Sequence, residues 1–497
     1  MKPCRQYRVI DMPPFIPIQK PRFSIGLAAV FCLVIFIPAH LPADDASATA
    51  SSAAPATSGA FLFQDVPKPV LFYGDDATAQ RMFTTLIETY TLSRFPNWNV
   101  TFRNTGWEDD KILGVGLRGY SRDQDIRRDI ESFRPQVALV NYGMNDARGG
   151  DAGYQYFLTC VNILSRDLPR VGVNRAAFIS ANPQEGYEAG MPAGSSYNVM
   201  LQKYAEGMKE RMPIGWKDGV SAVLAHPKGP DVPSLQNGIF IDILNPMIAL
   251  IEAGRKAGVL SADNSLGDKT VRLMPDGVHP NWSGHLIIAA LVLQGLQAPS
   301  LVSSARIDAA GHSTTSTQGC SLTWQDAPAG VVQFQRKDDA LPWPTPPETD
   351  LALKIPGFDP ATTLSRYELQ VTGLTEASYK LSIDDQEIGI YSKADLANGI
   401  NLGFVRLGPI YNQGQKLLKA VIDKNDTFFH RWREVELTPP PAPGTNPADI
   451  RKADAAHLDA VKPELDHLDK TIADDELAIK TLCQPHPHVF KLEPVGH

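Results

Sequence analysis

Five short apolar segments, separated by helical patterns, constrain the fold of this chain more than any other feature. They span residues 70–73, 99–102, 136–142, 176–179 and 238–241. The third is almost continuously apolar, as is typical of a parallel strand covered on both faces. Helical patterns lie between them, for example over residues 80–93, 151–165 and 197–211. This alternation predicts an α/β domain with right-handed crossovers, a parallel sheet and helices on both of its faces.

Polar residues gather where these segments end, and a fourth polar group precedes the apolar helical stretch at residues 286–296. The carboxyl ends of parallel strands share one edge of a sheet, so we expect these groups to meet there. The groups are Gly74-Asp75-Asp76, residues 106–110, Gly143-Met144-Asn145-Asp146 and Asp276-Gly277-Val278-His279. Acidic residues clustered in this way, such as Asp75, Asp76, Asp109 and Asp110, usually form a solvated rim.

Length and composition indicate an exported globular protein of two or three domains. The chain has 497 residues, 43% of them hydrophobic and 21% charged, which is enough to bury a sizeable core. A net charge of −8 argues against a nucleic-acid partner. Residues 1–43 have a basic flank and an apolar run at 23–37, which predicts a signal peptide and a periplasmic or extracellular location. An uncleaved anchor helix is the alternative; after cleavage we expect no stable membrane span.

The composition changes several times along the rest of the chain. Residues 44–60 are rich in Ala, Ser, Thr and Pro and are interpreted as a flexible linker. The α/β domain is expected at 61–300, and a β-rich accessory module with a helical segment at 301–438. A Pro-rich linker at 439–446 precedes an amphipathic helical tail at 447–497. Of the cysteines, Cys160 is expected in the core, and a bridge between Cys320 and Cys483 is left open.

Taken together, the four polar groups resemble those of the SGNH, or GDSL-like, hydrolase family over residues 61–300. The resemblance implies a three-layer, flavodoxin-like α/β/α domain, ester hydrolysis including that of acylated carbohydrate, and neither cofactor nor metal. It implies that His279 is the catalytic base, that Asp276 orients it and that Asn145 belongs to the oxyanion hole. The second group supplies a backbone N–H to that hole, so Gly106 and Asp109 are assigned to the cleft.

Two positions depart from the family pattern. The nucleophilic serine is replaced by Asp76, and the second-group glycine, two residues after Trp107, is replaced by Asp109. A serine hydroxyl gives its proton to histidine as it attacks, whereas a carboxylate has none to give and would hold His279 as a cation. Losing one oxyanion donor costs about 10²–10³ in rate, but Asp109 retains its backbone N–H.

Three hypotheses follow from the residues and the resemblance. The first is a hydrolase of small-molecule or carbohydrate esters with an altered catalytic set, in which Asp76 acts with His279. The second is a non-catalytic protein that keeps the cleft for binding. The third is a cation site formed by Asp76, Asp109 and Asn145, since carboxylate and amide oxygens suit hard cations.

Overall fold

The computed structural model describes residues 61–64, 66, 68–114, 122–185, 194–211, 237–261, 271–438, 442 and 445–495. The expected signal peptide at 1–43, the linker at 44–60 and most of the Pro-rich linker at 439–446 lie outside these residues. Within the described part, no helix combines the length and apolar character needed to span a membrane.

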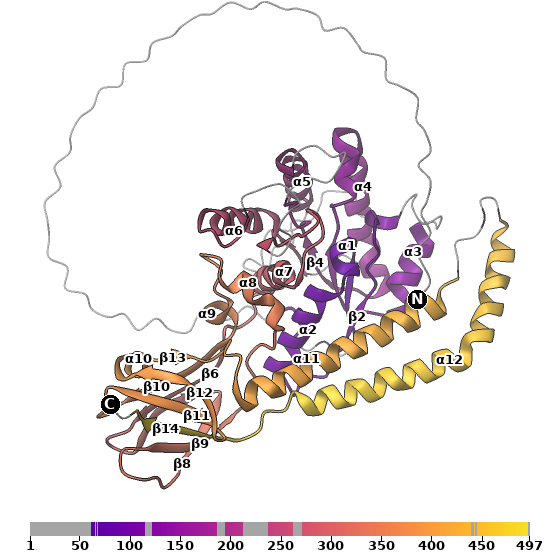
Figure 1. Ribbon diagram of the computed structural model, residues 1–497. Helices are drawn as coiled ribbons and strands as arrows, with labels where there is room; N and C mark the ends of the chain where they lie inside the picture. Colours follow the sequence, from indigo (N-terminus) through magenta and orange to yellow (C-terminus); the bar gives the residue numbers. More distant parts are fainter. Residues whose placement is uncertain are drawn as a thin grey trace, which may run out of the picture. The chain divides into compact units, whose positions relative to one another are not determined.

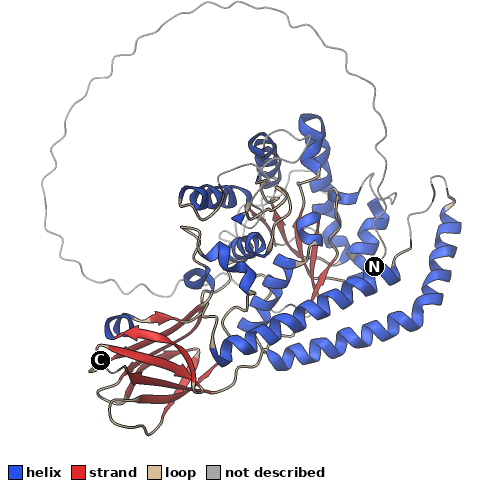
Figure 2. Ribbon diagram, in the orientation of Figure 1, coloured by secondary structure: helices blue, strands red, loops and turns tan. Residues whose placement is uncertain are grey.

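One five-stranded parallel sheet organises the first part of the chain (Figures 1 and 2). Its strands, in the order β2-β1-β3-β4-β5, are β1 (Val70–Gly74), β2 (Phe102–Asn104), β3 (Val137–Asn141), β4 (Arg175–Ile179) and β5 (Asn237–Ile241). The chain passes from β1 to β2 on one side and then returns across β1 to β3. The carboxyl ends of β1 and β3 therefore flank the topological switch point, where open α/β sheets place their sites.

Helices cover both faces of this sheet, so the predicted three-layer α/β fold is confirmed. Alternate side chains of β1 enter two separate cores: Val70 and Phe72 pack on one face, Leu71 and Tyr73 on the other. The first core is shared with α2 (Met82–Arg94) and α7 (Trp282–Gly295). The second is shared with α3 (Arg122–Asp129), α4 (Gly150–Asp167) and α5 (Gly194–Lys209), while α6 (Leu244–Lys256) reaches both.

The helical stretch expected at 80–93 corresponds to α2, and a short helix that was not expected precedes it. This helix, α1 (Asp76–Ala79), starts directly after the turn at the end of β1. Arg81 then adopts a left-handed backbone with φ 62°, which ends α1 and redirects the chain into α2. Single-turn 3-10 helices lie at Ile112–Gly114, Glu131–Phe133, Asp146–Gly149, Leu168–Val171 and Pro347–Thr349.

The β-rich module contains two sheets that share one hydrophobic core. The four-stranded sheet has the order β13-β10-β6-β7, and the five-stranded sheet β12-β11-β14-β9-β8. The strands are β6 (Leu301–Asp308), β7 (Ser313–Gln318), β8 (Cys320–Trp324), β9 (Val332–Asp338), β10 (Arg366–Thr372), β11 (Ser378–Ile383), β12 (Gln386–Ser392), β13 (Ile400–Asn401) and β14 (His488–Pro494). Short helices α8 (Asp350–Leu353), α9 (Pro360–Leu364) and α10 (Lys393–Asn398) complete it.

The strand β14 was not anticipated from the sequence, which predicted a helical tail to residue 497. After the long helix α12 (Pro447–Leu482), the chain inserts β14 between β9 and β11, with antiparallel pairs such as Phe490↔Phe334. Pairing with strands more than 100 residues away along the chain leaves no local pattern that would reveal it.

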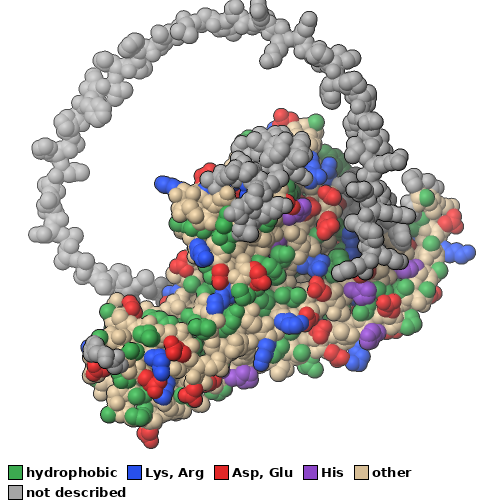
Figure 3. All heavy atoms as spheres, viewed as in Figure 1, with side chains coloured by type: hydrophobic (Ala, Val, Ile, Leu, Met, Phe, Trp, Pro, Cys, Tyr) green, Lys and Arg blue, Asp and Glu red, His purple; other side chains and the backbone are tan. Residues whose placement is uncertain are grey.

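The helix α11 (Gly408–Phe429) joins the C-terminal part to the α/β domain by packing on α2. The ammonium of Lys424 lies 2.7 Å from a carboxylate oxygen of Glu88, and both side chains are almost fully buried. A π-helix at His430–Glu436 continues α11, and α12 runs beside it (Figure 1). Acidic and basic side chains are interspersed on the face shown in Figure 3.

The three described cysteines are free thiols, so the bridge left open between Cys320 and Cys483 is not formed. Cys160 is buried on α4 in the second core, as expected. Cys483 is also buried, and it packs in the first core at the end of α12.

Candidate functional site

The turn between β1 and α1 brings Asp76 to the carboxyl edge of the sheet. It requires glycine at position 74, because a Cβ there would lie 2.2 Å from Thr78 Oγ1 and 2.4 Å from the Asn141 carbonyl oxygen. The Asp75 N–H donates to that same carbonyl over 3.1 Å, which fixes the turn against β3. Asp76 is then the first residue of α1, with its side chain 11% exposed.

Groups from three other segments surround the Asp76 carboxylate. The backbone N–H of Asp109 donates to Oδ1 over 3.1 Å, and the Asn145 side-chain amide donates to Oδ2. His279 Nε2 lies 3.6 Å from Oδ1. Four of the sequence-predicted residues, Asp76, Asp109, Asn145 and His279, thus meet at one point although they are spread over about 200 positions of the chain.

The loop before α7 holds His279 and Asp276 together. Asp276 Oδ2 lies 2.6 Å from His279 Nδ1, while Oδ1 accepts the backbone N–H groups of Val278 at 2.9 Å and His279 at 2.7 Å. Gly277 has φ +91°, a left-handed conformation that permits this tight turn. One imidazole therefore has a carboxylate on each side, with Asp276 at Nδ1 and Asp76 at Nε2.

Asp109 presents its backbone to the site and its carboxylate to solvent. Its φ is 57°, in the left-handed region that glycine favours and that Asp and Asn adopt more readily than most residues. Its side chain is 74% exposed and lies 3.6 Å from Arg148. The position thus keeps the backbone donor that the family resemblance implies for a glycine.

Gly106 does not contribute a donor to this group. Its N–H donates to Asn104 Oδ1 over 2.9 Å, and a Cβ at this position would lie 2.5 Å from the Ala79 backbone nitrogen. Gly106 therefore allows the second group to approach α1 closely. The sequence pattern could not separate this packing role from an oxyanion role.

The pKa values around the imidazole favour a charged His279. The contact with Asp76 is the largest cause, and it acts with Asp276 against burial to raise the pKa of His279 to about 9. Burial would raise the pKa of Asp76, but the nearby His279 and the hydrogen bonds from Asp109 and Asn145 outweigh burial and lower this pKa. Asp276 behaves in the same way and also has a lowered pKa. At neutral pH the site therefore holds an imidazolium between two carboxylates.

The other acidic residues of the cluster do not form the solvated rim expected from the sequence. Asp75 and Asp110 are 2% and 1% exposed, and Asp146 is also buried. Burial raises the pKa of Asp75 well above its ordinary value and that of Asp146 to about 7. Neighbouring segments contact them: the Ile112 N–H donates to Asp146 over 3.3 Å, and the Tyr142 hydroxyl donates to Asp110 over 2.9 Å.

The cation site proposed from the sequence is not supported by the geometry. Asp109 offers an N–H rather than its carboxylate, and the Asn145 amide donates to Asp76 instead of presenting an oxygen. In the part of the chain that the structure describes, no group of three His, Cys, Asp or Glu side chains is arranged to hold a metal ion.

Residues that the sequence analysis missed position the histidine loop. Glu185 is buried, and its Oε2 accepts the backbone N–H groups of Leu273 at 2.8 Å and Met274 at 2.9 Å. Its own N–H donates to the Gly277 carbonyl over 2.8 Å. Glu185 follows β4 in the segment 180–185, which also contains Ser180, Asn182 and Gln184, and these polar residues after a strand were the available signal.

A buried histidine joins the same loop to α1 and α2. His285 Nδ1 accepts the Phe83 N–H over 3.3 Å, and Nε2 lies 2.9 Å from Gln80 Oε1. The Gln80 amide in turn donates to the Pro280 carbonyl over 3.4 Å. Burial lowers the pKa of His285 to about 3, so this ring is neutral and structural.

The C-terminal part of the chain supports the segment that carries Asp109. Trp107 lies against Trp432 of the π-helix, edge to face, with ring centroids 5.7 Å apart. Trp432 is 1% exposed, so its role is in packing. The C-terminal helices thus hold one side of the candidate site.

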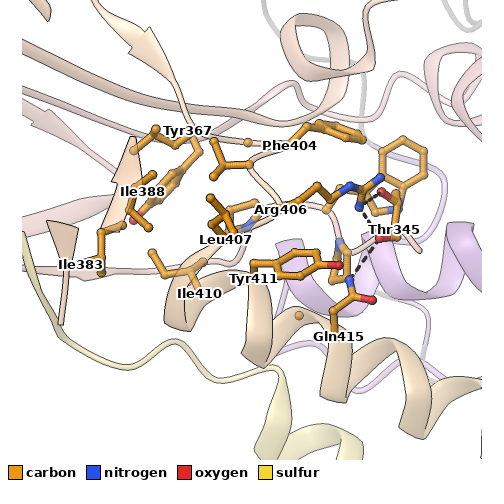
Figure 4. Close-up of a pocket in the computed structure, with 17 residues that line it drawn as sticks. Thr345, Tyr367, Ile383, Ile388, Phe404, Arg406, Leu407, Ile410, Tyr411 and Gln415 are labelled. Atoms are coloured by element: carbon orange, nitrogen blue, oxygen red, sulfur yellow. Dashed lines mark hydrogen bonds between the residues drawn. The ribbon is translucent and has the colours of Figure 1, made fainter. Parts of the chain in front are cut away.

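A separate hollow lies between the β-rich module and α11 (Figure 4). It encloses about 500 Å³, including space open to solvent, and Arg406 crosses it to donate to Thr345 Oγ1 over 2.9 Å and Asp350 Oδ1 over 2.8 Å. None of the candidate residues lines it. Its contacts are those of an interface within the fold rather than of the candidate site.

Comparison with known proteins shows the fold. No protein-family model and no curated protein sequence matches this chain. Among solved structures, a gut microbial diltiazem-metabolizing enzyme is similar over 86% of this chain and 98% of its own, with 19% identity and a TM-score of 0.65. An acetylxylan esterase from Geobacillus stearothermophilus covers 46% of this chain and 94% of its own, with 15% identity and a TM-score of 0.32, which is too low to support an argument.

Proposed function

We propose that the protein is an exported hydrolase of the SGNH, or GDSL-like, type that acts on ester bonds of small molecules or carbohydrates. In it, Asp76 takes the place of the nucleophilic serine of that family. The observation that supports this proposal is the convergence of Asp109 N–H, Asn145 and His279 on the Asp76 carboxylate. The similarity in fold to a diltiazem-metabolizing enzyme agrees with it.

The proposed roles follow from the contacts of each group. Asp76 is the nucleophile, since carboxylates form covalent ester intermediates in other enzymes. Asn145 and the Asp109 N–H stabilise negative charge that develops on oxygen. Asp276 fixes the ring orientation of His279 through the 2.6 Å contact to Nδ1, which leaves Nε2 directed at the nucleophile.

Turnover of short p-nitrophenyl esters tests the proposal. We expect measurable hydrolysis that is abolished by His279→Ala. The variant His467→Ala is the matched control, because His467 is an exposed histidine on α12. If the wild-type protein hydrolyses no ester across a range of acyl lengths, the proposal is wrong.

A non-catalytic binding protein is the second candidate, and one observation favours it. Both oxyanion donors already bond to Asp76, and the charge of Asp76 keeps His279 protonated. The donors and the histidine base are therefore unavailable for the family's acyl-transfer chemistry. This candidate predicts that Asp76→Ser, alone or with Asp109→Gly, creates esterase activity in an otherwise inert protein. If the double variant folds but remains inert, the replacement of these two residues does not explain the absence of activity.

A further inference from the structure

The two donors of the candidate site contact the enzyme's own carboxylate. Oxyanion donors promote acyl transfer when they bind the oxygen of the substrate carbonyl as it becomes negative. Here the Asp109 N–H bonds to Asp76 Oδ1 at 3.1 Å and the Asn145 amide bonds to Oδ2. If Asp76 attacked an acyl carbon, these donors would have to leave Asp76 and bind the carbonyl oxygen of the substrate.

Attack at a saturated carbon makes no such demand. A carboxylate that displaces a leaving group from an sp³ carbon develops no oxyanion on the substrate in that step. The carboxylate becomes an alkyl ester, and its remaining oxygen becomes a carbonyl oxygen. Water then attacks the Cγ of that ester, and the new oxyanion forms on Asp76 Oδ2, to which the Asn145 amide already donates.

We propose that this site hydrolyses alkyl esters of strong acids by breaking the bond between oxygen and a primary saturated carbon, with Asp76 as the attacking group. The substrate class is a primary carbon with a weakly basic anionic leaving group, such as an alkyl sulfate or sulfonate; alkyl halides share this chemistry. The inference rests on the proposed catalytic use of the site and specifies which bond is cleaved.

The reaction balances with water as the only co-reactant. In the first step Asp76 Oδ1 forms a bond to carbon, and the carbon–oxygen bond to the leaving group breaks with both electrons going to the departing anion. In the second step His279 takes a proton from water, and the hydroxide adds to Cγ. The intermediate collapses, the alkoxide takes that proton from His279, and the new carboxylic acid returns a proton to the ring.

His279 is placed to change its protonation between these steps. Its Nε2 lies 3.6 Å from Asp76 Oδ1, and the largest cause of its raised pKa is that contact. Alkylation removes the charge of Asp76, so the pKa of His279 falls toward neutral pH and the ring can release its proton to solvent. The imidazole, still oriented by Asp276, is then a base for water. Its side chain is 44% exposed, which gives water access.

Trapping the alkyl ester tests this inference directly. The variant His279→Gln keeps Asp76 but lacks the base, so incubation with n-hexyl sulfate or 1-bromohexane should leave one hexyl group on Asp76, detected by intact mass and peptide mapping. Asp76→Asn is the control and should carry none. An adduct with bromohexane alone would support the saturated-carbon step and exclude sulfate as the leaving group. No adduct on Asp76 with either probe overturns the inference.

Oxygen labelling distinguishes this inference from the proposed function. In ¹⁸O-water, the wild-type protein turning over hexyl sulfate should incorporate label into the Asp76 carboxylate and then hexanol, and none into sulfate. Label in sulfate overturns this inference, because it shows that water attacked sulfur rather than the Asp76 ester. Turnover of p-nitrophenyl esters that depends on His279, with no hexyl adduct, would retain the proposed function and reject this inference. A hexyl adduct on Asp76 without turnover of p-nitrophenyl esters would support this inference and reject the hydrolysis of carboxylic esters.

Discussion

Replacing Asp76 by Asn should move the protonation of His279 into the physiological range. The pKa of His279 is raised from 6.5 to about 9, and its contact with the Asp76 carboxylate is the largest cause. Asparagine keeps the size of the side chain but removes its charge, as alkylation of the carboxylate would. We expect the pKa of His279 to fall by about 1 to 2, because Asp276 still raises this pKa while burial lowers it.

The assay is an NMR titration of the imidazole Cε1–H resonances between pH 5 and 10, with His279 assigned by its absence from His279→Gln. Asp109→Asn is the matched control: it removes a nearby charge whose side chain is 74% exposed and directed away from the ring. It should leave the titration midpoint near its wild-type value. A His279 that still titrates near 9 in Asp76→Asn would refute the arrangement of the ring between two carboxylates.

Three further predictions concern stability and positioning. The pKa of Asp146 is about 7 in the folded protein against 3.8 ordinarily, so the native state binds the extra proton and stability falls as pH rises between these values. Asp146→Asn should therefore raise the free energy of unfolding by an amount on the order of 4 kcal/mol at pH 8 and little at pH 4, measured in urea; an equal effect at both would contradict this. Lys424→Met, which strands the buried Glu88 charge, should cost about 3–5 kcal/mol, and Lys424→Met with Glu88→Leu should recover most of it. Glu185→Ala should speed hydrogen exchange of the two backbone amides that its carboxylate accepts; unchanged rates would refute its positioning role.

The sequence by itself determined the class of fold and the segments that build the site. Strand and helix periodicities are local, so five strands could be identified, although β2 lies at Phe102–Asn104 rather than at 99–102. The polar residues at their ends could be paired in advance because parallel topology places those ends on one edge. The convergence of Asp76 and Asn145 followed from that rule, whereas the place of His279 was expected from the family resemblance.

Only the tertiary structure decided which atoms face one another. The backbone dihedral of Asp109 directs its N–H inward and its carboxylate outward, and no residue spacing encodes that choice. Burial of Asp75 and Asp146 depends on tertiary packing, so their raised pKa values could not be predicted from the sequence. The strand β14 pairs with distant partners, β9 and β11, and long-range pairing leaves no local signature. Patterns of neighbouring residues predict elements, whereas the chemistry of the site depends on contacts between elements.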